Sequence, residues 1–154
     1  MPDFRSLLLA IDLAAVKRDQ AMAQLQEMQR AHAFAEEQMR QLQQYAQETD
    51  QRWIQGAQRI TTPELLHHQY QFMGRLTQAI GLQEGALVST QRRVDAAKQG
   101  VLQAELRLAS LKQVLAQRQA ALSQRQARQE QKQMDEFAAQ QTLRQQRIQL
   151  ENSQ

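Results

Sequence analysis

Residues 56–72 read GAQRITTPELLHHQYQF and combine a glycine with the one internal proline of the chain. Pro63 is the only proline besides Pro2, and it follows closely behind Gly56. A glycine can adopt the left-handed backbone conformation that ends a helix. On both sides of this stretch the chain consists almost wholly of helix-favouring Ala, Leu, Gln, Arg, Glu and Met. We therefore expect one helix to end near Gly56.

The residues after this break predict the start of a second helix. Thr61 or Thr62 can serve as the N-cap, and Pro63 suits the first helical turn. Thr61-x-x-Glu64 also has the spacing of a capping box. The connection is short, and a short connection between two helices favours antiparallel packing.

The composition indicates a thin hydrophobic core. Aromatic residues make up 5% of the 154 residues, glutamine occurs 33 times, and the mean hydropathy is −0.69. So few large apolar side chains cannot fill a thick core, and burial must follow a narrow line along long helices.

Apolar residues recur at alternating intervals of three and four on both sides of the predicted turn. Twelve of fifteen such positions are apolar in the first series and thirteen of seventeen in the second. This spacing is the repeat of a coiled coil, and we call the two series the seam. The first series is Phe4, Leu7, Ile11, Ala14, Arg18, Ala21, Leu25, Met28, His32, Ala35, Met39, Leu42, Ala46, Thr49 and Trp53. The second is Leu66, Gln69, Met73, Leu76, Ile80, Gln83, Leu87, Thr90, Val94, Ala97, Val101, Ala104, Leu108, Leu111, Leu115, Arg118 and Leu122.

The two series predict a hairpin with arms of unequal length. A turn centred near residue 59 places position n opposite roughly 118 − n, so residue 4 falls near residue 114. The second series ends at Leu122, close to where its partner ends. Residues 1–57 carry 6 basic and 8 acidic side chains and residues 58–122 carry 8 and 4, so the arms attract mildly.

We predict an all-α fold, a long antiparallel two-helix coiled-coil hairpin with a protruding C-terminal helical tail. Its boundaries are a first helix over about 4–56, a turn over 57–62, a second helix over 63–122 and a tail over 123–154, in one domain. The tail has high helix propensity but no continuous apolar stripe, and it is either frayed or a lone helix. A monomer is expected, because the seam is buried within one chain.

Several classes of protein are excluded by the composition. The chain has no cysteine, which excludes disulfides and fits a reducing cytoplasm. The N-terminal apolar run is interrupted by Asp12 and lacks a small-residue cleavage site, so we expect no removed signal peptide. This run is also too short to span a bilayer.

No active site is predicted, and neither is a cofactor or a metal site. The neighbouring His67 and His68 point about 100° apart on a helix and cannot ligate one ion together. His32 falls on the seam, where a structural role is expected. No phosphate-binding loop motif is present. An extended hairpin offers no concave pocket that excludes water, so the protein is not expected to be an enzyme.

Four glycines lie within the predicted second helix, at positions 74, 81, 85 and 100. We expect them to permit close approach of the two helices. The alternative is a softened region that bends against a partner.

Two short stripes lie at the same predicted height, with Leu42 and Leu76 in the seam and Tyr45 and Phe72 flanking it. We call their eight residues the paired stripe: Gln38, Leu42, Tyr45 and Thr49 in the first helix, and Phe72, Leu76, Ala79 and Gln83 in the second. Side by side they form either a docking patch with a polar border or a broadened seam.

Several segments of the chain resemble the flagellar FliJ family. They are FRSLLLAIDLAAVKRDQAMAQL, the break near residue 60, FMGRLTQAIGLQEGAL and KQMDEFAAQQ, which together extend over nearly the whole chain. The resemblance implies a cytoplasmic protein of the flagellar type III export apparatus, similar in fold to the central stalk of rotary ATPases. It implies a non-catalytic role in flagellum biogenesis and motility, peripheral to the inner face of the cell membrane at the flagellar base.

The same resemblance implies three kinds of partner. They are the hexameric export ATPase, the cytoplasmic domain of the membrane export gate, and export chaperones. The family's gate-binding surface matches Gln38, Leu42, Tyr45, Phe72, Leu76 and Ala79. At two further positions of this surface the chain differs from the family, which has an aromatic residue where Thr49 lies and a histidine where Gln83 lies. Contacts with the ATPase ring are expected from Arg5, Lys17, Arg18, Arg125, Arg128, Lys132, Asp135, Glu136 and Phe137.

Three alternatives remain at this stage. The corresponding stalk of a virulence injectisome would have the same helical and apolar sequence pattern, so the pattern does not distinguish the two systems. A structural spacer built as a parallel homodimer predicts twice the mass of a monomer. Nucleic-acid binding through the basic second arm lacks an aromatic and basic platform, and it is the least favoured.

Overall fold

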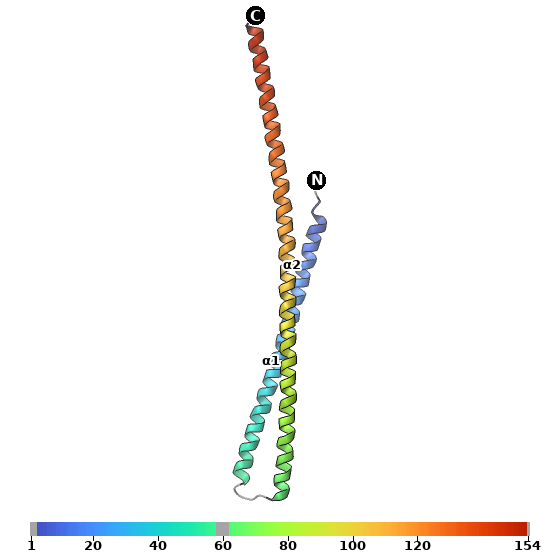
Figure 1. Ribbon diagram of the computed structural model, residues 1–154, viewed down its shortest axis with the longest axis vertical. Coiled ribbons are helices and arrows are strands. Elements are labelled where there is room, and N and C mark those ends of the chain that lie inside the picture. Colours follow the sequence, from blue (N-terminus) through green and yellow to red (C-terminus); the bar gives the residue numbers. More distant parts are fainter. Residues whose placement is uncertain (1–2, 58–61, 154) are drawn as a thin grey trace. The chain divides into compact units, whose positions relative to one another are not determined.

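Two long helices make up nearly all of the described chain. The computed structural model describes residues 3–57 and 62–153. Helix α1 spans Arg5–Ala57, helix α2 spans Pro63–Asn152, and no strand occurs in these residues (Figure 1). The helices pack against each other, which confirms the predicted all-α hairpin.

Helix α2 begins with a threonine cap. The Leu65 backbone N–H donates to Thr62 Oγ1 at 3.2 Å, and the Leu66 N–H donates to the Thr62 carbonyl at 3.1 Å. Pro63 therefore occupies the first helical position, as predicted, where its missing N–H has no cost. Thr61 and its capping box lie outside the described residues.

The first helix ends one residue beyond Gly56, close to the predicted position. Helix α1 continues through Gly56 to Ala57, and no described glycine has a positive φ. A glycine permits the left-handed conformation without requiring it, so Gly56 located the helix end without predicting its backbone conformation.

The chain divides into two compact units, each containing parts of both helices. One is Leu13–Arg107, and the other combines Met1–Asp12 with Leu108–Gln154. We call them the turn unit and the tail unit and describe each by itself.

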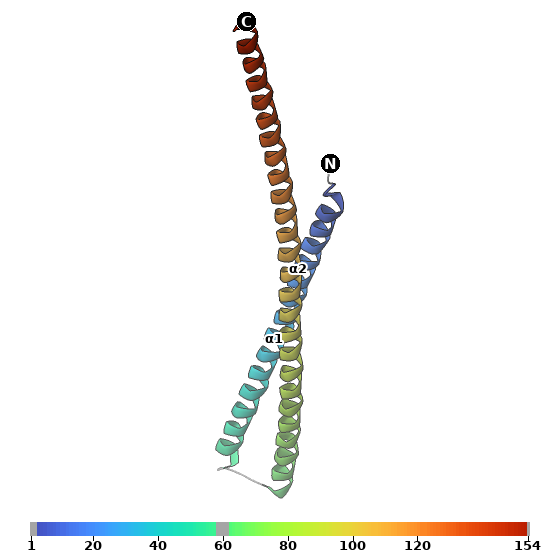
Figure 2. The same cartoon turned by 45° about the horizontal axis from the view of Figure 1, so that its top comes forward.

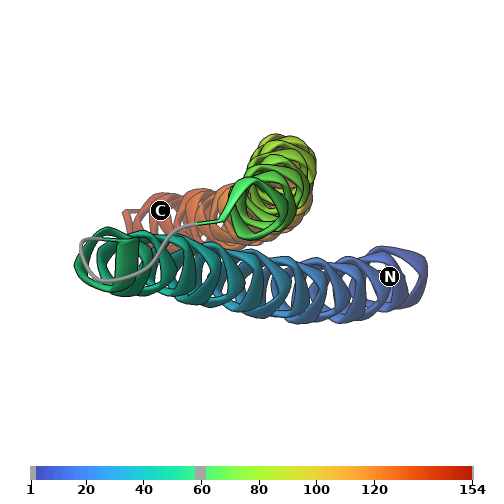
Figure 3. The same cartoon turned by 90° about the horizontal axis from the view of Figure 1, so that it is seen from below.

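In the turn unit the helices are antiparallel. His32 Nδ1 lies 2.7 Å from Thr90 Oγ1, and Gln83 Nε2 donates to the Ala35 carbonyl at 2.8 Å. Nearer the turn, the rings of Tyr45 and Phe72 are 6.1 Å apart. As the residue number of the contact increases along α1, the number of its partner on α2 decreases, which is the pattern of antiparallel helices. Figure 3 shows α1 crossing α2 obliquely, as side-chain ridges that pack into grooves require.

The seam is the line of burial in both helices. All fifteen first-series positions are buried or half-buried, and Ala10 and Ala15 are the only other residues of 5–56 that are not exposed. Fifteen of the seventeen second-series positions are likewise covered, and the exceptions are Leu66 and Arg118. The most buried apolar residues are Ala14, Ala35, Met39, Leu76, Val94 and Leu108.

The predicted register holds near the turn and shifts farther from it. Ala35 meets Gln83 as expected, but His32 meets Thr90 instead of residue 86. In the tail unit, Phe4 lies in a hollow with Arg118 and Leu122 instead of opposite residue 114. A seam side chain contacts residues one turn apart on the facing helix. The rule that position n lies opposite 118 − n is therefore accurate only to about one turn.

Beyond Leu122 the described tail is a helix without a partner. Leu122 is half-buried, and every residue of 123–153 is exposed. Helix α2 nevertheless continues to Asn152, and Figure 2 shows no other segment of the tail unit beside its C-terminal end. Of the two alternatives for the tail, the structure has the lone helix.

The expectation that glycines bring the two helices close together is wrong. A Cβ atom added at Gly74, Gly81, Gly85 or Gly100 would meet nothing within 4 Å. The first three lie on the side of α2 away from the seam, where the helix faces solvent.

The cap geometry makes a prediction about stability. Thr62→Ala removes the side-chain acceptor for Leu65 N–H and should lower the free energy of unfolding by about 1 kcal/mol. Thr62→Ser, which keeps the hydroxyl, should cost much less. Urea denaturation followed by circular dichroism measures both. A loss of this size from Thr61→Ala, with none from Thr62→Ala, would assign the cap to the other threonine.

Candidate docking surfaces

The structure brings the two halves of the paired stripe together in the turn unit. The Tyr45 and Phe72 rings meet edge to face, with an interplanar angle of 84°. About two turns away along α1 and three along α2, Gln83 Nε2 lies 3.5 Å from Gln38 Oε1. The two stripes therefore form one surface that crosses from α1 to α2.

Members of this surface differ in how far they are covered. Leu76 is buried, and Gln38 and Tyr45 are exposed, with half of the tyrosine surface open to solvent. Leu42, Thr49, Phe72, Ala79 and Gln83 are half-buried. Phe72 also lines a shallow surface hollow with Arg75 and Leu76. The paired stripe thus broadens the seam and still leaves an aromatic ring and an amide on the surface.

Polar contacts border the exposed end of the paired stripe. Arg40 forms an ion pair with Glu37 at 2.6 Å and donates to Gln44 Oε1 at 3.2 Å. The hydrogen bond from Arg40 holds the pKa of the exposed Glu37 carboxyl below its ordinary value. The ring of Tyr45 therefore lies beside a polar border, which is the arrangement typical of docking patches.

A histidine links the two helices next to this surface. His32 Nδ1 contacts Thr90 Oγ1, and its Nε2 lies 2.7 Å from Glu36 Oε1. The Thr90 hydroxyl also lies 3.1 Å from the Leu87 carbonyl. Both ring nitrogens thus have partners, which fits the structural role predicted for His32. The contact between His32 and Thr90 was not predicted from the sequence, because the rule that n lies opposite 118 − n places His32 opposite residue 86, one turn from Thr90.

The residues expected to contact an ATPase ring are distributed over both units. The tail unit holds Arg5, Arg125, Arg128, Lys132, Asp135, Glu136 and Phe137, and the turn unit holds Lys17 and Arg18. All of the tail residues among them are exposed. Asp135 accepts a hydrogen bond from Gln131 at 3.1 Å, and Arg125 borders the hollow that contains Phe4.

Two of the N-terminal arginines already have acidic neighbours. The Arg5 backbone N–H donates to Asp3 Oδ1 at 2.9 Å, and its Nε lies 3.9 Å from the same oxygen. Arg18 donates to Asp19 Oδ1 from Nε and Nη2 and is half-buried at its seam position. Lys17 is exposed. Of the three, Lys17 has the most freely available charge.

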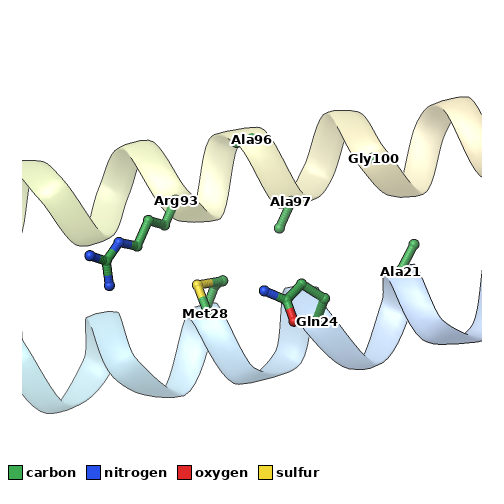
Figure 4. A pocket seen from close by; sticks show the side chains of 7 residues that line it. All are labelled: Ala21, Gln24, Met28, Arg93, Ala96, Ala97 and Gly100. Atoms are coloured by element: carbon green, nitrogen blue, oxygen red, sulfur yellow. The ribbon is translucent and has the colours of Figure 1, made fainter.

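A further groove lies between the helices in the middle of the turn unit. Figure 4 shows Met28 and Gln24 of α1 facing Arg93 and Ala97 of α2 across it. Its other lining residues are Ala21, Ala96 and Gly100. Because small residues occupy both sides, the seam is underfilled here, and sequence reasoning did not identify this groove.

Residues 3–57 and 62–153 contain neither a metal site nor a membrane-spanning helix. No three His, Cys, Asp or Glu side chains of these residues lie close enough together to hold a metal ion. His67 and His68 are both exposed. Neither helix contains, in the described residues, a segment long and apolar enough to cross a membrane.

The ring contact predicts an energetic coupling between Tyr45 and Phe72. In a double-mutant cycle of Tyr45→Leu and Phe72→Leu, the unfolding free energies should be coupled by about 0.5–1 kcal/mol, since aromatic pairs stabilise beyond the area they bury. Urea titrations of the four proteins measure it. A matched cycle in which Phe34→Leu, at an exposed ring, replaces Tyr45→Leu should give no coupling with Phe72→Leu. A zero value for Tyr45 and Phe72 as well would contradict the contact.

Comparison with known proteins identifies the family. A family model described as flagellar FliJ protein matches residues 4–147, which is most of the 154-residue chain. No curated protein matches the chain in the corresponding search. The matched range includes α1, most of α2 and the paired stripe, in agreement with the segments that resemble the family. The chain therefore belongs to the FliJ family and is a component of flagellar protein export.

Proposed function

We propose that this protein is a non-catalytic stalk and adaptor that couples the hexameric export ATPase to the membrane export gate. The observation that carries the proposal is the combination of a FliJ-family chain with a two-helix body and a long helix that continues alone beyond Leu122. A single helix is about 10 Å wide with its side chains. It is therefore slender enough to enter a pore that a two-helix rod fills more tightly.

The tail is the proposed element for contact with the ATPase. Its basic residues Arg125, Arg128 and Lys132 recur at intervals of three and four, so they form one exposed line along α2. Asp135 and Glu136 follow at the end of this line. Exposed charges of this kind have little effect on the stability of the hairpin, which leaves them available for a partner.

The paired stripe is the proposed surface for the export gate. Tyr45 provides the anchor, because it combines an exposed ring with a fixed position against Phe72. An aromatic side chain held in place loses little conformational freedom on binding, and such residues often dominate the energy of an interface. Gln38 adds polar contacts at the edge.

The remaining roles follow from the family resemblance. The protein handles empty export chaperones, and it acts in the cytoplasm at the base of the flagellum, associated with the membrane through the export apparatus. No catalytic residue, cofactor or metal takes part. A virulence injectisome stalk is the alternative system, and the flagellar family match favours the flagellar one.

Tail charges give a test of the ATPase contact. Arg125→Glu with Arg128→Glu should reduce stimulation of the purified export ATPase at least roughly tenfold, since each reversal replaces an attraction by a repulsion. Arg92→Glu with Arg93→Glu changes the charge equally on exposed residues of the turn unit and should leave stimulation intact. A chain ending at residue 122 should fold but fail to stimulate. Full stimulation by that shortened chain would exclude the tail.

Gate binding gives an independent test. Tyr45→Ala should weaken binding to the gate's cytoplasmic domain roughly tenfold, as expected for a partly exposed aromatic anchor. Tyr70→Ala is the matched control, because Tyr70 is 80% exposed and lies outside the paired stripe. Isothermal titration calorimetry measures both affinities, and circular dichroism checks the fold. Equal affinity of the Tyr45 variant and the wild type would assign the paired stripe to stability alone.

A further inference from the structure

The described tail helix has one face with few charges and one with a line of basic residues. Ala127, Met134 and Ala138 lie along the middle of the first face, and Ile148, Phe137 and Glu130 lie towards one edge of it. Arg125, Arg128 and Lys132 point to the other side. Met134, Phe137 and Ile148 are 68%, 62% and 55% exposed, so the apolar part of this face is open to solvent. An apolar stripe on a lone helix is a surface that lacks its partner.

Two opposite charges border this face at equal distances from its centre. The face extends from Ala127 to Ile148, and its midpoint falls between Phe137 and Ala138. Glu130 lies seven residues before Phe137 and Arg144 lies seven after it, on the same edge of the helix. Both are exposed, and neither has a hydrogen bond or ion pair with any described residue.

We propose that this face binds the same face of a second copy, with the two tails antiparallel about a two-fold axis at Phe137. In this arrangement Glu130 of each chain meets Arg144 of the other, so the pair forms twice. The two Phe137 rings meet at the axis, and Ile148 of one tail lies opposite Gln126, next to Ala127, of the other. Identical surfaces in contact across a two-fold axis are the commonest form of protein self-association.

The charges favour this arrangement over a parallel one. In a parallel pair in register, Glu130 and Arg144 of different chains would lie about 21 Å apart along the axis, at 1.5 Å per residue. In that parallel pair, each of these residues would lie next to the identical residue of the other chain, which has the same charge. An antiparallel pair brings opposite charges together.

This self-association leaves the hairpin unchanged, because the seam is already buried within one chain. It differs from a parallel spacer dimer, which would use the seam itself. The face is small, so we expect a dissociation constant on the order of 10–100 µM. The proposal does not depend on the export function, since it concerns the purified chain alone.

Charge reversal tests the proposal in the full-length protein. Sedimentation equilibrium from about 5 to about 500 µM should show a monomer–dimer equilibrium, weakened roughly tenfold by Glu130→Arg or by Arg144→Glu. The double variant Glu130→Arg with Arg144→Glu should restore wild-type association. A monomer at all concentrations, or a double variant weaker than either single one, would overturn the proposal.

Cross-linking tests the direction of the tails, and the absence of native cysteines makes it clean. Ala138→Cys lies next to the proposed axis and should cross-link to its own copy through a short bis-maleimide. Ala127→Cys lies on the same face but about 15 Å from the axis, so the two copies would be about 30 Å apart and should not cross-link. Efficient cross-linking of Ala127→Cys would indicate parallel tails and contradict the proposal. The export ATPase is absent from both experiments, so failure of the pairing leaves the proposed function standing.

Discussion

The fold depends on a narrow line of apolar contact between α1 and α2. Within the described residues its most buried members are small or medium-sized, and no large side chain is completely buried. Each seam residue therefore removes less area from water than a residue in a globular core, and stability accumulates along the length of the pair. Because α1 is shorter than α2, the seam ends at Leu122 and the rest of α2 is left without a partner. One constraint thus produces both the hairpin and the free tail.

A line of weak apolar contacts would by itself permit sliding by a heptad, so polar seam residues are important for register. Gln83 donates to the Ala35 carbonyl, and His32 contacts Thr90, and both bonds require one particular alignment. A slip of seven residues would leave these groups half-buried without partners, which costs more than the bonds contribute. Gln69 Nε2 differs from these two, since it is buried with no hydrogen-bond partner among the described residues and fixes no register. Polar seam positions commonly set the register of coiled coils.

The sequence predicted the helices and the seam well because both depend on local periodicity. Every first-series position is covered, and Pro63 begins α2 as expected. Features that depend on exact geometry were predicted less well. Helix α1 ends one residue beyond Gly56, but Gly56 lacks the left-handed conformation, since a glycine permits that conformation without requiring it. The contact of His32 with Thr90 was missed by one helical turn, because antiparallel side chains interdigitate. At the docking surface, spacing predicted that the stripes would meet but not that Tyr45 would remain half exposed.

The faces of the tail distinguish the kinds of partner it can have. The residues assigned to ring contact lie on both sides of the helix, with Arg125, Arg128 and Lys132 on one side and Phe137 towards the other. A flat partner contacts one side of a helix, whereas a ring surrounds it and can contact every side. Contacts on both sides are therefore consistent with the proposed entry into a ring. The proposed pairing of two tails uses the face of Ala127, Met134 and Ala138, with Glu130 and Arg144 at its edge, and leaves the basic line exposed. Because Phe137 would be used in both complexes, a tail paired with another copy cannot be fully enclosed by a ring, and the two states would exclude each other.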